Sequence, residues 1–599
     1  MRSVPMANAR APRDGFRLGG ASRGGASRRG ASRRGGVPPA SVLLAATAVA
    51  CGGPAPEAEP FDVVEATIPE MQAAMESGRL TSRQLVMEHL ARIARYEWWL
   101  NAAVSINPNV LGEAEALDAE RAAGNVRGPL HGIPVALKDN IHTTHLPTTG
   151  GSLAFEGYFP PYEATLTTNL REAGAIIIAK AGLTEFANFM AGPPNQMPGN
   201  YNALTGYGLN PYDPRRDPRE GRNDGRPALS TGGSSSGIGT AASFWSANVG
   251  TDTGGSIISP SNANMLVGIR PTLARVSRWG VAPVTLDHDM AGPMARTVTD
   301  AAIVLGAMEG AAPDPNDAAT ARCVAPPGRD YTPFLNAGGL EGARIGIPRA
   351  FYYEPVEIGG ATIGGLNGEA AALMSEAILV LEAAGAVVVD PAEIPSFVDP
   401  DPEANFNAWP LCIGGHQAKG SDEGCSVNFK YGMKRDFDAW LASLGPSAPV
   451  GTLTELREWN LAHRDAGSMK YEQSRYDISD EMDVDADRAR NAADMAKDSL
   501  LSRTRGIDAV LEAYDLDAIF TPGSRGAALA ARAGYPHIVV PFGFVPNAPT
   551  PAFPGGFDAR PAPFGIGFTG GACSEPRLIE LAYAFEQATL RRVPPESFP

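Results

Sequence analysis

The sequence has few of the residues that build metal centres, disulfide scaffolds or histidine-based active sites. Its 599 residues include five Cys and eight His. The cysteines are too sparse for a disulfide-stabilised scaffold, and no Cys-x-x-Cys pair or Cys/His cluster has zinc-ligand spacing. No histidine lies in a recognised catalytic-triad motif, and no Gly-x-Ser-x-Gly motif is present. We therefore expect no metal and no cofactor, and a catalytic serine would need a base other than histidine.

Long apolar runs and net positive charge are also missing from most of the chain. No apolar run after residue 51 is long enough to cross a bilayer. The formal net charge is −16, and it is more negative without the first 50 residues, which hold nine Arg and one Asp. An acidic chain is repelled by nucleic acids and by anionic membranes. We expect a small-molecule or peptide substrate and no nucleic-acid partner.

The N-terminal segment resembles an export signal. Residues 1–50 combine a basic region with the short apolar run SVLLAATAVA. Cys51 follows AVA directly, as in the bacterial lipoprotein box, and two Arg-Arg pairs resemble twin-arginine signals. This pattern predicts an export or lipoprotein signal over 1–50, a flexible tether over 51–66 and a periplasmic or cell-envelope protein whose only membrane contact is a lipid on Cys51. The alternative is a misplaced start codon upstream of a plain signal.

Strand and helix patterns alternate through the rest of the chain, residues 67–599. The runs 131–141 and 173–182 are short, apolar and bounded by turn residues, which is typical of buried strands. Helical spacing and a Thr81-x-x-Gln84 capping box predict helices before them. Further strands are expected at 517–523 and 537–544, and a closing helix follows. Alternation of this kind predicts an α/β fold.

Two long segments show less regular patterning. Residues 192–231 are rich in Gly, Pro, Asn and Arg and predict a long surface loop, while 390–470 are richer in Trp and Phe and suit a pocket wall. Cys412 and Cys425 bracket a loop-like stretch and could form a local disulfide.

The segment GGSSSGIGTAASFWSANVGTDTGGS, residues 232–256, concentrates glycines and hydroxyl side chains without a histidine. The candidate base for one of its serines is Lys138, at the end of a predicted strand and among apolar residues. Burial there would lower the lysine pKa by several units from about 10.4 and make a neutral amine available. The alternative from the residues alone is a solvated lysine at a strand end.

The motifs HGIPVALKDNI, GGSSSG and GTDTGGSI, in this order, resemble the amidase signature family, the Ser-cisSer-Lys hydrolases. The resemblance continues through GIRPTLARVSRWGVAPV, DHDMAGPMARTVTDAA and AGYPHIVVPFGF and spans roughly residues 67 to 595. It implies an α/β fold with one large domain and a central mixed, mostly parallel twisted sheet covered by helices on both faces. RGPLHGIP and FKYGMKRDFDAWLASLG are most similar to exported peptide amidases.

The resemblance also implies catalytic roles by motif position. Lys138 matches the base, Ser234 the relaying serine that follows a cis peptide bond, and Ser256 the nucleophile. The oxyanion hole would be formed by the backbone N–H groups of Thr253, Gly254, Gly255 and Ser256. The implied reaction is amide hydrolysis through an acyl-enzyme on Ser256.

Other residues of the motif are assigned structural roles. Asp252 is interpreted as a buried hydrogen-bond acceptor, and Ser235 and Ser236 as supports of the loop. Ile257 and Ile258 follow the nucleophile where members that handle substrate carboxylates often have Arg, which favours an apolar or peptide-like amide over free glutamine. Two alternatives stay open: an esterase on the same scaffold, and a non-catalytic envelope lipoprotein that only binds its ligand.

Two departures from the family pattern affect the expected site geometry. The spacing from Ser234 to Ser256 is about two residues shorter than the family resemblance leads us to expect, so the intervening helix or turn should be trimmed. The 192–231 loop is longer than expected and would shape the mouth of the site.

Overall fold

A computed structural model describes residues 61–413 and 420–599 of the chain. The predicted signal over 1–50 and the lipidation site at Cys51 lie outside these residues. Within them, Val63 is 3% exposed and Glu65 forms an ion pair of 2.6 Å with Arg592. Packing against the domain therefore begins before residue 67, so the predicted tether boundary is a few residues too late. None of the helices in these two ranges combines the length and the apolar character that a membrane crossing requires.

One mixed sheet of 11 strands forms the centre of the domain. In spatial order its strands are β1 (Ala103–Ile106), β3 (Ile176–Ala181), β2 (Pro134–Lys138), β6 (Ala247–Asp252), β8 (Met290–Ala295), β7 (Val267–Arg270), β14 (His537–Val545), β15 (Ala562–Thr569), β13 (Ala518–Pro522), β9 (Arg344–Gly346) and β12 (Val387–Val389). The parallel pairs are β3–β2 and β2–β6 on one side and β13–β9 and β9–β12 on the other, and the joins between them are antiparallel. Because β2 and β6 are parallel neighbours, their carboxyl ends meet at one edge of the sheet.

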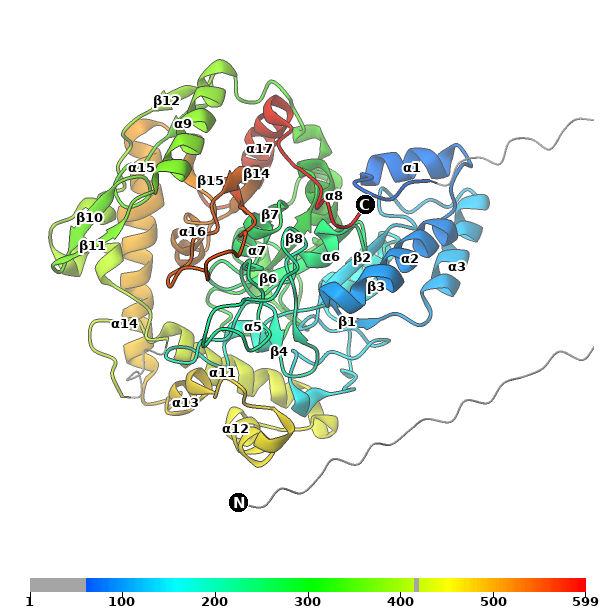
Figure 1. Ribbon diagram of the computed structural model, residues 1–599, viewed down its shortest axis with the longest axis horizontal. Coiled ribbons are helices and arrows are strands. Elements are labelled where there is room, and N and C mark those ends of the chain that lie inside the picture. The colour runs from blue at the N-terminus through cyan, green and yellow to red at the C-terminus, as the bar shows by residue number, and fades with distance from the viewer. Residues whose placement is uncertain (1–60, 414–419) are drawn as a thin grey trace, which may run out of the picture. The chain divides into compact units, whose positions relative to one another are not determined.

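Helices cover both faces of the sheet, as the sequence predicted (Figure 1). In β3, Ile177 belongs to the large core on one face, whereas Ile176 and Ile178 face a second core that contains Trp245. The alternation is the two-residue period of a strand buried on both sides. Helices α4 (Thr165–Glu172), α8 (Val298–Met308), α9 (Gly368–Ala383) and α17 (Glu575–Thr589) pack over the first face, and α2 (Ser82–Leu100), α3 (Val110–Ala122), α6 (Ile238–Ala241) and α7 (Ile258–Ala263) over the second.

Local sequence signals account well for the first helices and strands. The capping box predicted at Thr81 is present, since Gln84 N–H donates to Thr81 Oγ1 over 3.1 Å and Thr81 N–H donates to Gln84 Oε1 over 2.9 Å. A second capping box at Thr67 starts α1 (Ile68–Glu76). The predicted strands ending near Lys138 and at 173–182 are β2 and β3, and those at 517–523 and 537–544 are β13 and β14.

A separate aromatic core lies outside the sheet layers. Helices α11 (Asn428–Ser443), α12 (Leu453–Ala462) and α13 (Ser474–Asp480) lie together at one end of the molecule (Figure 1) and enclose Phe186, Phe437 and Trp440. This region contains the aromatic-rich part of 390–470 that the sequence marked as a pocket wall. The 192–231 loop holds only the two-residue strands β4 (Tyr201–Asn202) and β5 (Gly206–Tyr207) in this part of the structure.

Two disulfides connect the four cysteines of the described residues. Cys412 and Cys425 are bridged, so the local disulfide that the sequence allowed is present. Cys323 and Cys573, 250 residues apart, form the second bridge, which the sequence did not indicate.

The C-terminal half also contains helix α14 (Arg488–Ser499), the short helix α15 (Asp508–Tyr514) and helix α16 (Ala527–Ala533). Earlier in the chain there are two short helices, α5 (Glu185–Asn188) and α10 (Pro395–Val398), and a hairpin formed by β10 (Pro355–Ile358) and β11 (Ala361–Gly364).

Candidate active site

Lys138 is the last residue of β2, and its side chain is fully buried. Its Nζ lies 3.0 Å from Ser234 Oγ, 2.7 Å from Thr251 Oγ1 and 3.3 Å from the Thr251 carbonyl oxygen. Burial lowers the pKa of Lys138 to about 7, against the opposing attraction of Asp252 and Asp289. A fraction of the lysine is therefore neutral near pH 7, as a base requires.

Ser234 is held close to Lys138 by the glycine-rich loop before it. Gly232 has φ +91°, and a Cβ there would lie 2.4 Å from Pro260 Cα, so only glycine fits this close approach. Ser234 is fully buried, and its carbonyl oxygen accepts a hydrogen bond of 3.1 Å from the Thr184 N–H. The loop thus places one serine hydroxyl against the lysine amine.

The cis bond predicted before Ser234 is wrong for this structure. Cis peptide bonds in the described residues occur at Pro193–Pro194, Asp390–Pro391 and Thr550–Pro551. The bond from Gly233 to Ser234 is therefore trans, the conformation that a non-proline bond adopts by default. The loop turns instead at Gly232, whose backbone has a positive φ.

Ser256 follows β6 in the turn that contains Thr253, Gly254 and Gly255, and it is partly exposed. The residue after Ser234 is hydrogen-bonded to it: Ser235 N–H donates to the Ser256 carbonyl oxygen over 3.3 Å. The Ser256 hydroxyl makes no hydrogen bond to any residue in 61–413 or 420–599. The structure therefore brings Lys138 and Ser234 into contact and places Ser256 beside them, but the Ser234–Ser256 hydrogen bond of the expected relay is not formed.

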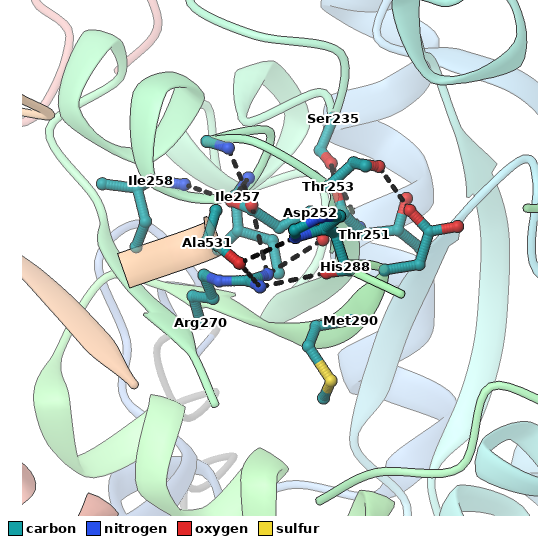
Figure 2. Close-up of polar contacts among 12 residues, drawn as sticks. Ser235, Thr251, Asp252, Thr253, Ile257, Ile258, Arg270, His288, Met290 and Ala531 are labelled. Carbon is teal, nitrogen blue, oxygen red and sulfur yellow. Dashed lines mark hydrogen bonds and ion pairs between the residues drawn. The ribbon is translucent and has the colours of Figure 1, made fainter. Parts of the chain in front are cut away.

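Asp252 and Arg270 form a buried pair beneath this turn (Figure 2). Asp252 accepts hydrogen bonds of 2.7 Å from the N–H groups of both Gly255 and Ile257, and Arg270 Nη1 lies 3.3 Å from its Oδ1. Arg270 also donates to the His288 carbonyl oxygen over 3.0 Å. Asp252 is thus a structural acceptor that shapes the turn, as the sequence indicated.

The hydrogen bond from Gly255 changes the predicted oxyanion hole. Because its N–H is already bonded to Asp252, Gly255 has no free donor for a substrate in this structure. The N–H groups of Thr253, Gly254 and Ser256 donate to no acceptor within the described part of the protein, so they remain available. Gly254 is also exposed, and Gly255 has φ +123°, which favours glycine.

The neighbouring serines support the loop unequally. Ser235 Oγ donates to the Thr251 carbonyl oxygen over 3.0 Å, and it accepts from the Thr251 N–H over 3.2 Å. The Ser236 hydroxyl is buried with no hydrogen-bond partner in the described residues, although its N–H donates to the Gly182 carbonyl oxygen. The connection between Ser234 and Ser256 contains the four-residue helix α6.

Sequence reasoning missed two groups of this site. Thr251 lies near the end of β6 and contacts the lysine directly, and the signal for it is that β6 is the parallel neighbour of β2, which ends at Lys138. Asp289 accepts a hydrogen bond of 2.5 Å from Thr253 Oγ1, and burial raises its pKa to about 7. The aromatic wall comes from Phe429 of α11, whose ring is 3.6 Å from the position of a Cβ on Gly254. No cluster of His, Cys, Asp and Glu in 61–413 and 420–599 could hold a metal ion.

Comparisons with known proteins show which family the chain is similar to. A family model described as Amidase matches residues 84–579. A probable amidase of Arabidopsis thaliana is 34% identical over 542 residues, which cover 90% of this chain and 92% of that protein. A putative amidase of Arthroderma benhamiae is 31% identical over 542 residues, which cover 89% of this chain and 83% of that protein. The crystal structure of native peptide amidase from Stenotrophomonas maltophilia is similar with a TM-score of 0.74 and 34% identity, over 90% of this chain and 99% of that one.

Proposed function

Because the chain belongs to the amidase family and is a hydrolase of carbon–nitrogen bonds, we propose that it hydrolyses carboxamides through an acyl-enzyme on Ser256. The observation that carries the proposal is the fully buried Lys138 amine, 3.0 Å from the Ser234 hydroxyl and with its pKa lowered to about 7. A neutral amine can donate two hydrogen bonds and accept one. The Lys138 amine contacts the two Thr251 oxygens and the Ser234 hydroxyl, and in its neutral form its lone pair can accept the Ser234 O–H.

The proposed reaction begins with a proton relay. Neutral Lys138 takes the proton of Ser234 while Ser234 takes that of Ser256, and Ser256 Oγ attacks the carbonyl carbon. This step requires the Ser256 hydroxyl to turn toward Ser234, since the two are not hydrogen-bonded in the structure. The negative oxygen of the tetrahedral intermediate would be stabilised by the free N–H groups of Thr253, Gly254 and Ser256. The same relay protonates the departing amine, and water then cleaves the acyl-enzyme.

We further propose an apolar or peptide-like amide as the substrate. Phe429 lies against the exposed Gly254, and its ring centre is 6.1 Å from that of Phe189. Ile257 and Ile258 are fully buried, and Arg270 is paired with Asp252, so none of these three side chains can bind a substrate carboxylate. These contacts favour a peptide or aryl amide over free glutamine. The peptide amidase of known structure supports the same substrate class.

The test is turnover of a panel of aliphatic, aryl and C-terminal peptide amides, each with its matched ester, by protein that starts at residue 52. We expect amide hydrolysis by the wild type and a loss of at least about a thousandfold in Ser256→Ala. Labelling of Ser256 by a serine-directed fluorophosphonate should disappear in the same variant. Ser236→Ala is the control, because that hydroxyl makes no hydrogen bond to any described residue, and it should retain turnover. Hydrolysis of esters alone would identify an esterase, and unlabelled wild type would identify a non-catalytic binding protein.

We also propose that the protein is exported and that Cys51 carries a lipid. The basic and apolar pattern of residues 1–50 supports this, and so do the two disulfides, which persist in oxidising compartments. Intact-mass analysis of the mature N-terminus would reveal lipidated Cys51 if the proposal is correct and an unprocessed Met1 if it is wrong.

A further inference from the structure

Asp289 is a buried carboxyl group that connects the turn after β6 to the neighbouring strand. Thr253 Oγ1 donates to its Oδ1 over 2.5 Å, and the N–H groups of Val284 and Thr285 donate to its Oδ2 over 2.8 and 3.0 Å. Asp289 directly precedes β8, which pairs with β6 in a register that places Asp252 opposite Met290. The turn is therefore held from two sides, by Asp252 through backbone N–H groups and by Asp289 through the Thr253 side chain.

We propose that Asp289 is a positioning residue for the hydrolysis: it holds the oxyanion turn through Thr253, and its negative charge favours the ammonium form of Lys138. This inference rests on the proposed function and extends it to a residue that does not touch the substrate.

Two carboxyl groups attract the Lys138 ammonium, Asp252 more strongly than Asp289, and they differ in their ion-pair partners. Asp252 and Asp289 both attract the Lys138 ammonium, but Asp252 is already paired with Arg270 at 3.3 Å. On the other side of β2, Asp139 is paired with Lys180 at 3.2 Å, so this second ion pair is balanced too. Thr251, which contacts the Lys138 amine, lines the same small cavity as Thr253 and Asp289, and Asp289 has no cationic partner at ion-pair distance in the described residues.

Asp289 itself titrates in the same pH range. Burial raises its pKa to about 7, the Thr253 and backbone hydrogen bonds oppose this, and the charge of Asp436 on α11 adds to the increase. An ionised Asp289 favours the ammonium form of Lys138, whereas a protonated Asp289 can donate its O–H to Thr253 and adds no negative charge beside the oxyanion turn. Because Asp289 and Lys138 interact, the decrease of the reaction rate on the acid side reflects the titration of both groups together.

The experiment compares Asp289→Asn with Asp287→Asn. Asparagine at 289 mimics the protonated acid, since its NH₂ can donate to Thr253 Oγ1 while its oxygen accepts from Val284 and Thr285. Asp287 lies in the same turn but is partly exposed and paired with Arg435 at 2.9 Å, which makes it a matched control. The readout is the second-order rate of Ser256 labelling by a fluorophosphonate between pH 5 and 9.

We expect the wild-type labelling rate to fall on the acid side with a midpoint near pH 7, where Lys138 becomes protonated. Removing the negative charge of Asp289 lowers the pKa of Lys138, so the midpoint of Asp289→Asn should move down by roughly half to one pH unit. The midpoint of Asp287→Asn should stay at the wild-type value. Loss of packing alone would slow labelling at all pH values without moving the midpoint.

Thr253→Val tests the positioning role separately, because it removes the hydroxyl and keeps the backbone N–H. We expect labelling at the optimal pH to slow by roughly tenfold, as the turn loses one of its two anchors. Equal midpoints for Asp289→Asn and wild type would overturn the role of the charge. If Asp289→Asn does not fold, unchanged labelling of Thr253→Val overturns the proposal. Wild type that is not labelled at all would instead contradict the proposed function, and this inference would end with it.

Discussion

The ammonium form of Lys138 is unfavourable in the fold, because its Nζ is buried among hydroxyl and carbonyl oxygens rather than beside a carboxylate at ion-pair distance. The lowered pKa expresses this cost. The pKa falls from the ordinary 10.5 to about 7, and a shift of this size corresponds to a destabilisation on the order of 5 kcal/mol. The unfolded chain binds the proton more tightly, so the cost is complete below pH 7, decreases between pH 7 and 10.5, and vanishes above that.

Replacing Lys138 by Met should therefore stabilise the protein while it abolishes turnover. We expect a gain of roughly 1–3 kcal/mol at pH 6, less than the full cost because Thr251 and Ser234 lose a hydrogen-bond partner. At pH 9 the gain should be about half as large, since the cost in the wild type is then partly relieved. Denaturant unfolding at the two pH values measures both.

The control for this substitution is Lys180→Met. Lys180 is equally buried, but it is paired with Asp139 at 3.2 Å and also donates to Thr148 Oγ1 over 2.7 Å. Its loss leaves a buried carboxylate unpaired and should destabilise the protein by roughly 3–5 kcal/mol. If Lys138→Met were as destabilising as Lys180→Met, the assignment of Lys138 as an uncompensated buried base would be wrong.

At the level of elements, the site depends on how closely the loop before Ser234 approaches helix α7. That approach is possible because Gly232 combines φ +91° with backbone contacts that no side chain could share: a Cβ would lie 2.4 Å from Pro260 Cα and 2.6 Å from the Ser259 carbonyl oxygen. The loop precedes Ser234 and helix α7 follows Ser256. Gly232 therefore controls the position of Ser234 relative to the turn that contains Ser256.

Gly232→Ala should disrupt this arrangement. The alanine must clash with backbone or displace the loop, and we expect a loss of at least about 3 kcal/mol in stability together with loss of Ser256 labelling. Gly221→Ala is the control, because Gly221 also has positive φ, +71°, but has no atom within 4 Å of its Cβ position. It should cost only about 1 kcal/mol and leave labelling intact. Equal effects of the two substitutions would show that φ, and not the close approach, is what matters.

At the level of the whole molecule, the bridge from Cys323 to Cys573 connects distant parts of the chain. Cys573 lies two residues before the start of α17, and Glu575, the first residue of that helix, accepts a hydrogen bond of 2.5 Å from the Thr272 N–H and lies 3.0 Å from Arg275 Nη1. The contacts join the C-terminal helix to the chain that follows β7. The disulfide thus restrains the C-terminal helix on the sheet.

Breaking the two disulfides separately should therefore give unequal losses. Cys573→Ser opens a loop of 250 residues and should cost roughly 3–5 kcal/mol, whereas Cys412→Ser opens one of 13 residues and should cost roughly 1–3 kcal/mol, because closing a longer loop restricts the unfolded chain more. Thermal unfolding of each variant under oxidising conditions measures the difference. A larger loss in Cys412→Ser would contradict this order and would place the main restraint in the aromatic region instead.

The sequence by itself determined the features that depend on near neighbours. The capping boxes at Thr67 and Thr81, the buried strand that ends at Lys138 and the glycine-rich turn before Ser256 all follow from residues within a few positions of one another. Burial of Lys138 did not follow from the residues alone, which also allowed a solvated lysine at the strand end; the resemblance of the motifs to the family favoured a buried base. The order of the motifs along the chain was sufficient to identify the family and the fold.

The tertiary structure decided the contacts that depend on strand order and register. Thr253 meets Asp289, 36 residues later in the chain, only because β6 pairs antiparallel with β8. Gly255 donates inward to Asp252, and the Ser256 hydroxyl stays apart from Ser234, because backbone geometry sets side-chain directions that residue types leave open. The Cys323–Cys573 bridge likewise depends on two segments whose encounter no local pattern encodes. Such contacts arise from the balance of packing over the whole domain, so they become visible only in three dimensions.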